Sequence, residues 1–384
     1  MPPRSDDAPE QLSIRIVALA DVSSHDVERW KALADRSVEP NVYLDPRFLV
    51  PARDRPDAAG IRIMFIERDD ELRGVFQFST GRLEDRWPIA IATTGGPFMS
   101  IHSDRHHPLI AREDVDRTVL ELVRGLGSPG LPGLTLLRYL PTDGPLADAF
   151  ASAFDALGYR RLERSSRSSA YVGQGYESSD PHSLFDFSHV SSSRAKAYRR
   201  RARGIERDAG DAPLALVDRR DDPAVVEDFL DFQAAGWKGD PSKGGGAFRL
   251  DPVHESWYRQ VVAGFARDGD LLAPVLVAGD EVVFMALDFR SGGAAFGFID
   301  AYNERFASQG AGTLGRLAEL QYIATKTDAT HFDPAFDPRY SDSTKLYPDR
   351  RGYVDVLVGR SLRARAVLTL LPLAKRIRER LKRS

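Results

Sequence analysis

Residues 309–313, Gln-Gly-Ala-Gly-Thr, stand between two segments that predict regular structure. The apolar segment 294–299 predicts a strand, and the apolar residues of 313–325 recur at helical spacing. Glycine gives the backbone access to φ > 0 and lets a ligand approach closely. The first N–H groups of a helix lack internal partners and point toward an anion placed there. This order of strand, glycine turn and helix therefore predicts a cradle for a pyrophosphate group.

The glycine turn does not fit the two best-known phosphate-binding motifs. The third glycine of a dinucleotide fingerprint would be Gly315, but no βαβ unit with a ribose-binding acid follows it. No Gly-Lys-Ser/Thr sequence occurs, which excludes a P-loop. A glycine-rich helix start that serves only as a turn is the alternative interpretation.

Other catalytic classes find little support in the sequence. His102, His106 and His107 lie close together, and the first two would share one face of a helix as metal ligands. Pro108 and the glycines before this segment favour a loop, and no His-Glu-x-x-His motif is present, so we predict no metal site. The absence of cysteine excludes thiolate nucleophiles, and no Gly-x-Ser-x-Gly elbow indicates a serine hydrolase.

Size and composition predict a globular protein of two domains. The chain has 384 residues, of which 42% are hydrophobic and 28% charged. Its net charge of −3 provides no global field for nucleic acid. The first residues lack the apolar core of a signal peptide, and the longest apolar run, 366–374, is far shorter than the roughly 20 residues of a membrane span. We expect a disordered segment at 1–10 and a cytoplasmic protein.

Similar element patterns occur in the two halves of the chain. Residues 61–78 predict two strands joined by an Asp-Asp turn, and 271–289 predict two strands joined by a Gly-Asp turn. The repetition at about half the chain length indicates two related lobes, with chance similarity of two hairpins as the alternative. The other predicted elements are helices at 115–126, 146–157, 224–235 and 252–266 and strands at 134–140, 159–172 and 214–217.

Two segments predict basic helices. Serine caps introduce the arginine-rich segment 191–207, which is either a solvated linker helix or a patch for phosphate or another anion. The segment 361–384 is basic and amphipathic and is interrupted at Pro372. It would dock on the body of the protein or make peripheral contact with an anionic membrane surface.

Three segments in a fixed order carry a resemblance to a known family. Residues 229–239 predict a helix ending in Trp-Lys-Gly, and 300–312 read Asp-Ala-Tyr-Asn-Glu, six further residues and the Gly-x-Gly turn. His-Phe-Asp-Pro follows at 331–334, and Lys345 comes later. This order resembles the GNAT-like acyltransferases related to the CelD type of cellulose biosynthesis, which are kin of the FemABX peptidyltransferases. The resemblance covers 185–358, and the first half only by its hairpin pattern.

The chain departs from the family pattern at two places. The coenzyme A loop of GNAT acyltransferases has Arg/Gln-x-x-Gly-x-Gly/Ala before a helix, which Gly310 and Gly312 match. Ala307 stands where that pattern has Arg or Gln. The family's Tyr-Lys pair is split here, with four residues between Tyr340 and Lys345. Both departures leave the cofactor contacts and the donor open.

The resemblance implies transfer of an acyl group from a coenzyme A thioester to an amine or hydroxyl. Such a reaction needs an amide near a splayed strand edge for the thioester oxygen, here around 298–300, and a base for the acceptor's proton. The implied catalytic residues are Lys238, Asp300, Glu304 and Asp333, with Tyr302 as the acid for the departing thiolate. The implied donor contacts are Gln309, Gly310, Ala311, Gly312 and Thr313, and the substrate contacts are Trp237, Asp337, Tyr340 and Lys345.

Each of these residues also has a purely structural interpretation. Lys238 would be an exposed helix end, Asp300 and Asp333 would cap strand ends, and Trp237 would belong to the core.

The sequence thus predicts an α/β (α+β) fold of two tandem GNAT-like lobes, each a mixed sheet flanked by helices. The expected lobes span 11–180 and 181–360, and the basic helix 361–384 follows them. The predicted function is acyl transfer from acetyl-CoA or a longer acyl-CoA to a small molecule, sugar or peptide. One alternative uses aminoacyl-tRNA as donor and assigns 191–207 to the RNA backbone. The other is a non-catalytic lobe pair that binds a ligand or partner.

Overall fold

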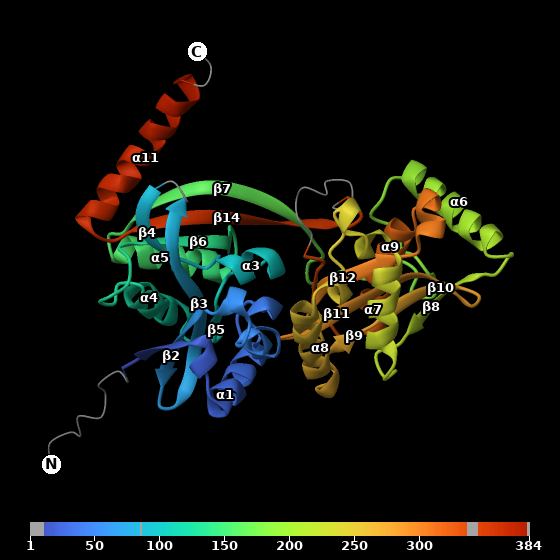
Figure 1. Ribbon diagram of the computed structural model, residues 1–384, viewed down its shortest axis with the longest axis horizontal. Helices are drawn as coiled ribbons and strands as arrows, with labels where there is room; N and C mark the ends of the chain where they lie inside the picture. The colour runs from blue at the N-terminus through green and yellow to red at the C-terminus, as the bar shows by residue number, and fades with distance from the viewer. Residues whose placement is uncertain (1–10, 85–86, 336–344, 382–384) are drawn as a thin grey trace. The chain divides into compact units, whose positions relative to one another are not determined.

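The computed structural model describes residues 11–381 except 85–86 and 336–344 (Figure 1). Its contacts divide the chain into two compact units, Met1–Arg167 with Gly352–Ser384, and Ser168–Arg351. The lobe boundaries expected at 180 and 360 both lie further along the chain than the observed boundaries at 167 and 351. The segment 1–10, expected to be disordered, is outside the described residues.

The first unit is built on an eight-stranded sheet. Its strands, in spatial order, are β1 (Ser13–Ala18), β2 (Arg62–Arg68), β3 (Glu71–Glu84), β4 (Trp87–Thr93), β6 (Leu134–Pro141), β14 (Asp349–Gly359) and β7 (Arg160–Tyr171), with β5 (Leu109–Ile110) beside β3. The β2–β3 hairpin is the one predicted from the sequence, and both residues of its turn, Asp69 and Asp70, have positive φ. Strands β4 and β6 are parallel, as the helical crossover between them requires.

Helices cover both faces of this sheet. They are α1 (Ser24–Asp35), α2 (Pro46–Leu49), α3 (Pro97–His102), α4 (Val115–Gly125), α5 (Pro145–Ala156) and α11 (Leu362–Leu381). Trp30 of α1 meets Phe65 of β2 edge to face, whereas Val119 of α4 packs in a cluster with Met64 of β2. Because neighbouring strand residues point to opposite faces, α1 and α4 lie on opposite sides of the sheet.

The C-terminal helix differs from its prediction. It continues through Pro372 instead of ending there, and its N-terminal half packs on the first unit through Ala364 and Leu368. Leu362 and Leu370 remain exposed. No helix in the described part of the chain combines the length and apolarity needed to cross a membrane.

The second unit contains a six-stranded sheet. Its strands, in spatial order, are β13 (Phe332–Asp333), β12 (Ala294–Tyr302), β11 (Glu281–Ser291), β10 (Pro274–Ala278) and β8 (Leu214–Asp218), with β9 (Leu271–Leu272) beside β11. The β10–β11 hairpin is the second predicted hairpin. Only β12 and β13 are parallel among the described pairs of this sheet.

Helices lie on both faces of the second sheet as well. They are α6 (Ser192–Asp208), α7 (Val225–Ala235), α8 (Pro252–Arg267) and α9 (Ala311–Lys326). In β11, Phe284 lies against Gly315 of α9, whereas Phe289 stacks on Phe265 of α8. Side chains five positions apart in a strand face opposite ways, so α8 and α9 cover opposite faces.

The two sheets share one strand order. Strands β1-β2-β3-β4-β6 of the first unit correspond to β8-β10-β11-β12-β13 of the second, and the last pair is parallel in both. In each unit a helix, α4 or α9, connects the two parallel strands. The predicted α/β fold with two mixed sheets flanked by helices is therefore confirmed.

Candidate active site

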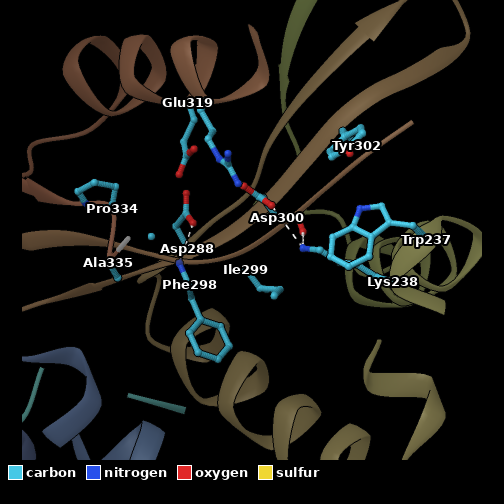
Figure 2. Close-up of a pocket in the computed structure, with 12 residues that line it drawn as sticks. Trp237, Lys238, Asp288, Phe298, Ile299, Asp300, Tyr302, Glu319, Pro334 and Ala335 are labelled. Carbon is cyan, nitrogen blue, oxygen red and sulfur yellow. Dashed lines mark hydrogen bonds and ion pairs between the residues drawn. The ribbon is translucent and has the colours of Figure 1, made fainter. Parts of the chain in front are cut away.

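A pocket of about 330 Å³ opens in the second unit where β12 and β13 separate (Figure 2). Within the part of the chain that the structure describes, the two strands pair at 295–296 with 332–333 and no further. Gly297 sets their closest approach, since a Cβ there would lie 2.9 Å from the carbonyl oxygen of Pro334. The lining comprises Trp237, Lys238, Asp288, Gly297, Phe298, Ile299, Asp300, Tyr302, Arg316, Glu319, Pro334 and Ala335.

A β-bulge in β12 shapes one wall of this pocket. Leu287 pairs with Ile299 and Phe289 with Phe296, so Asp288 stands opposite two residues of β12. The N–H of Phe298, inside the bulge, donates to Asp288 Oδ1 at 3.2 Å. The amide predicted to meet a thioester oxygen is thus held by a buried carboxylate.

Lys238 reaches the pocket because the helix before it ends early. Helix α7 ends at Ala235, as the prediction of a helix at 224–235 had it, because Gly236 adopts an extended conformation with ψ −171°. The helix does not continue to residue 239, where the Trp-Lys-Gly segment was predicted to end it. Trp237–Gly239 then forms a separate 3₁₀ turn, and Gly239 packs so tightly on Ala234 that no side chain would fit. This turn directs the Lys238 ammonium group toward β12, where it donates to the backbone carbonyl of Asp300.

Asp300 is the centre of an ionic network. Arg316 Nε donates to Asp300 Oδ2 at 2.7 Å, and Lys238 Nζ lies 3.4 Å from Oδ1. Burial by itself raises the pKa of Asp300, but the charges of Arg316 and Lys238 outweigh burial and hold the pKa below its usual value. An ionised Asp300 bound by two cations is suited to positioning other groups and is a weak base.

Asp288 and Glu319 form a second carboxyl group pair. Asp288 is 1% exposed and Glu319 5%, and their carboxyl groups face one another (Figure 2). Burial raises the pKa of Asp288 to about 7. Burial and the charges of Asp288 and Asp300 raise the pKa of Glu319 well above its usual value. Two facing carboxyl groups in a buried site cannot both ionise cheaply, so the pair holds a proton near neutral pH.

The glycine turn leads into α9 as predicted. Gly310 has φ +77° and precedes the first helical residue, Ala311. A Cβ on Gly310 would meet Arg201 Nη1 at 3.2 Å, so an arginine of α6 lies over the turn. A Cβ on Gly312 would instead meet the Tyr302 ring at 3.0 Å. Gly312 therefore makes room for Tyr302, and Gly310 faces a cation.

The other predicted residues lie in varied surroundings. Glu304 accepts a hydrogen bond from the Trp237 backbone N–H and is not part of the pocket lining. Asp333 is buried and accepts from the Ala335 N–H at 2.9 Å. Gln309 donates through its side chain to Asp208 of α6. Lys345 is exposed, and Thr313 lies in the first turn of α9. The predicted contacts Asp337 and Tyr340 lie outside the described residues.

Three charged residues of the pocket were missed from the sequence, namely Asp288, Arg316 and Glu319. Two signals could have found them. Asp288 interrupts an otherwise apolar strand, and Arg316 and Glu319 are three residues apart on the helix that follows the glycine turn. Across the described residues, no group of three or more His, Asp or Glu side chains is arranged to hold a metal ion.

In the first unit, side chains fill the position that corresponds to this pocket. Beyond the parallel pairing of β4 with β6, the Arg138 N–H donates to Thr94 Oγ1 at 2.8 Å, and the Arg138 side chain reaches Ser100. Helix α4 begins after Glu113 and Asp114, so carboxylates stand at its N-terminal end, whereas Gly310 precedes the N-terminal end of α9. The glycine turn and the pocket described above therefore belong to the second unit.

Comparison with known proteins also distinguishes the second unit from the first. Residues 192–336 match the family model described as an acetyltransferase (GNAT) domain. This segment is similar to GNAT acetyltransferase domains. It contains α6, the pocket strands β11 and β12, the glycine turn and α9.

Solved structures share the fold over most of the chain. A conserved protein of unknown function from Bacteroides thetaiotaomicron has a TM-score of 0.54 at 11% identity, covering 91% of this chain and 99% of that one. A domain from Agrobacterium fabrum, described as the C-terminal domain of a lysylphosphatidylglycerol synthetase, has a TM-score of 0.52 at 15% identity, covering 91% and 95%. FemX has a TM-score of 0.51 at 10% identity, covering 90% and 98%. No curated protein matches the chain by sequence.

Proposed function

We propose that the protein transfers an acyl group from acyl-CoA to an amine or hydroxyl of a small molecule, sugar or peptide. The observation that carries this proposal is the pocket at the separation of β12 and β13, in the domain that matches the GNAT family, with carboxyl groups buried inside it. A reaction that moves an acyl group to a nucleophile needs such a partly enclosed site with a proton acceptor.

The glycine turn is the proposed donor site. The amides at the start of α9, from Gly310 to Thr313, would bind the pyrophosphate of coenzyme A. Arg201 lies over Gly310 and forms no ion pair with any described residue. Its guanidinium group would add a charge-assisted contact and take the part of the Arg or Gln that Ala307 replaces.

Within the pocket we assign positioning roles to the ionic network. Asp300 holds the Lys238 ammonium group and Arg316 at fixed places on the wall. Tyr302, next to the glycine turn, is the proposed acid for the departing thiolate. Trp237 would cover the pocket mouth, since its half-buried ring lies beside the Lys238 ammonium group at 6.0 Å.

An aminoacyl-tRNA donor is the second candidate. It is favoured by helix α6, whose exposed cationic side chains are Arg194, Lys196, Arg199, Arg200, Arg201, Arg203 and Arg207. Such a surface suits a phosphate backbone. Kinship with the CelD type and with FemABX proteins is part of the same proposal. The non-catalytic alternative is less well supported, because binding alone does not require protonatable carboxyl groups buried in the pocket.

The test is a calorimetric titration of coenzyme A and acetyl-CoA with the full-length protein. We expect binding, with a thermal stabilisation that corresponds to about 2.7 kcal/mol at a hundredfold excess over Kd. Arg201→Gln should weaken coenzyme A binding about tenfold. The matched control is Arg203→Gln, because residue 203 lies about 200° around α6 from residue 201. Absence of binding by any acyl-CoA, together with salt-sensitive binding of tRNA, would favour the second candidate instead.

A further inference from the structure

The first unit contains a pocket of about 210 Å³ between helix α5 and the strands β6, β14 and β7. Its floor consists of buried apolar side chains, namely Leu140, Phe150, Phe154, Val354 and Val356. Ala147 and Ala151, one turn apart on α5, line the pocket with short side chains and so leave space between the helix and the sheet. An apolar cavity of about 150 Å³ is large enough to bind benzene, so this pocket has room for a branched or aromatic side chain.

Two side chains of opposite charge line the same pocket. Arg161 and Glu163 are two positions apart in β7, so both project from the face of the strand that borders the pocket. Within the described part of the chain, Glu163 forms neither a hydrogen bond nor an ion pair, with Arg161 or with any other residue. The Glu163 carboxylate is therefore available to a cation that enters the pocket.

The guanidinium group of Arg161 is held by one of its two edges. Nη1 donates to the backbone carbonyl of Ala151 at 3.3 Å and lies 3.3 Å from Asp155 Oδ1, near the end of α5. Nε and Nη2, on the other edge, have no partner among the residues that the structure describes. Two such N–H groups lie side by side and match the two oxygens of a carboxylate. Arg161 thus offers a carboxylate-binding edge in the pocket that Glu163 also lines.

We propose that this pocket binds a free α-amino acid with an apolar side chain. The ammonium group pairs with Glu163, the carboxylate binds the Nε and Nη2 edge of Arg161, and the side chain lies against the apolar floor. Residues two positions apart in a strand are separated by about 7 Å, a spacing that the long side chains of Arg and Glu can narrow to that of the two charged groups of one amino acid. The inference concerns the first unit alone and does not depend on the proposed acyl transfer.

Each part of this ligand answers one feature of the pocket. A carboxylic acid without an ammonium group leaves Glu163 without a cation and brings a second negative charge near it. An amine without a carboxylate leaves the Nε and Nη2 edge of Arg161 without an acceptor. Complementarity to both charges therefore favours a zwitterion. The apolar floor favours a large aliphatic or aromatic side chain over that of glycine, because burial of apolar surface stabilises the complex.

The experiment is a calorimetric titration of the full-length protein with L-leucine and three analogues. 3-Methylbutylamine lacks the carboxylate, 4-methylpentanoate lacks the ammonium group, and glycine lacks the apolar side chain. We expect leucine to bind, and the amine and the acid to bind about fivefold more weakly, because each loses one solvent-exposed ion pair. Glycine should bind at least about tenfold more weakly, since it buries no apolar side chain.

Substitution of the two charged residues assigns each group of the ligand to its partner. Glu163→Gln should weaken leucine binding about fivefold without weakening the binding of 4-methylpentanoate. Arg161→Gln should weaken leucine binding to a similar extent without weakening the binding of 3-methylbutylamine. Arg160→Gln is the matched control, because neighbouring residues of a strand project to opposite faces, and it should leave all affinities unchanged.

The apolar part of the site is tested with Ala151→Leu, which fills the pocket and should abolish leucine binding. Its control is Ala156→Leu, at an exposed position of α5 outside the pocket lining, which should bind leucine as the wild type does. Circular dichroism establishes that each variant folds. If Ala151→Leu does not fold, the variants of Arg161 and Glu163 decide the question.

Four outcomes would overturn the inference. They are no leucine binding by the wild type, leucine affinity unchanged in Glu163→Gln and Arg161→Gln, equal affinities for leucine and glycine, and equal affinities for leucine and 3-methylbutylamine. Leucine binding that is lost in Asp288→Asn but kept in Glu163→Gln would place the amino acid in the second unit, and would overturn it as well.

Discussion

The contact between Asp300 and Arg316 allows a quantitative test of the pocket wall. Arg316→Gln would leave Asp300 with Lys238 as its single cation, and Asp300→Asn would leave Arg316 without its carboxylate. The two side chains are 18% and 21% exposed, and their atoms are 2.7 Å apart. The pair is thus neither fully buried nor freely solvated, which sets the size of the expected effect.

The gross attraction of such a pair is about 4 kcal/mol in a medium of intermediate polarity. Desolvation of both charges cancels much of it, and a charge-assisted hydrogen bond keeps a net value of about 1.5–3 kcal/mol. We therefore expect a coupling energy of about 2 kcal/mol between Asp300 and Arg316. The surface pair Arg305–Glu281, whose side chains are 52% and 37% exposed, should show a coupling below about 1 kcal/mol.

Urea denaturation at pH 7 of the wild type, both single variants and the double variant measures this coupling energy. The same cycle on Arg305 and Glu281 is the control. The lowered pKa of Asp300 also contributes stability above the usual aspartate pKa, which is lost as the pH falls. Arg316→Gln should reduce that acid-dependent loss. A coupling energy no larger than that of the control pair would refute the proposed role of Asp300 as the centre of the network.

Two further predictions concern the same helix and strand. Burial raises the pKa of Asp288 and Glu319, so the stability they contribute is complete below their pKa in the unfolded chain, near 4, and is lost as the pH rises through their pKa in the folded protein, about 7 for Asp288. Urea midpoints measured between pH 5 and 8 should therefore fall more steeply for the wild type than for the double variant Asp288→Asn/Glu319→Gln. Parallel curves for the two proteins would contradict this. Gly315→Ala would place a Cβ 2.0 Å from Phe284 Cγ, so we expect the free energy of unfolding to fall by about 1–3 kcal/mol despite the better helix propensity of alanine. Thermal unfolding measures this loss against the control Gly60→Ala, where a Cβ would have no atom within 4 Å. Equal stability of both variants would contradict the tight packing of α9.

Local patterns in the sequence were sufficient to predict most elements of the second unit. The hairpin at 271–289, the strand at 294–299 and the helix after the glycine turn follow from apolar periodicity and turn residues, which depend on near neighbours along the chain. The repeated hairpin also predicted two similar sheets, because strand pairing through a tight turn is local.

The composition of the pocket depended on tertiary structure. Asp288 reaches it because a bulge in β12 changes the pairing by one residue, and Glu319 reaches it because α9 packs in one rotational setting on β11. Lys238 and Asp300, 62 residues apart in sequence, meet because Gly236 ends α7 early. Bulges, helix rotation and such long-range contacts result from packing among distant segments.

The glycine turn shows both contributions in one motif. Its position between a strand and a helix, and the positive φ that Gly310 requires, could be predicted from the sequence alone. The structure added that Gly312 accommodates the Tyr302 ring and that Arg201 of α6 lies over Gly310. Those two contacts join segments far apart in the chain, and side-chain packing in the folded domain determines them.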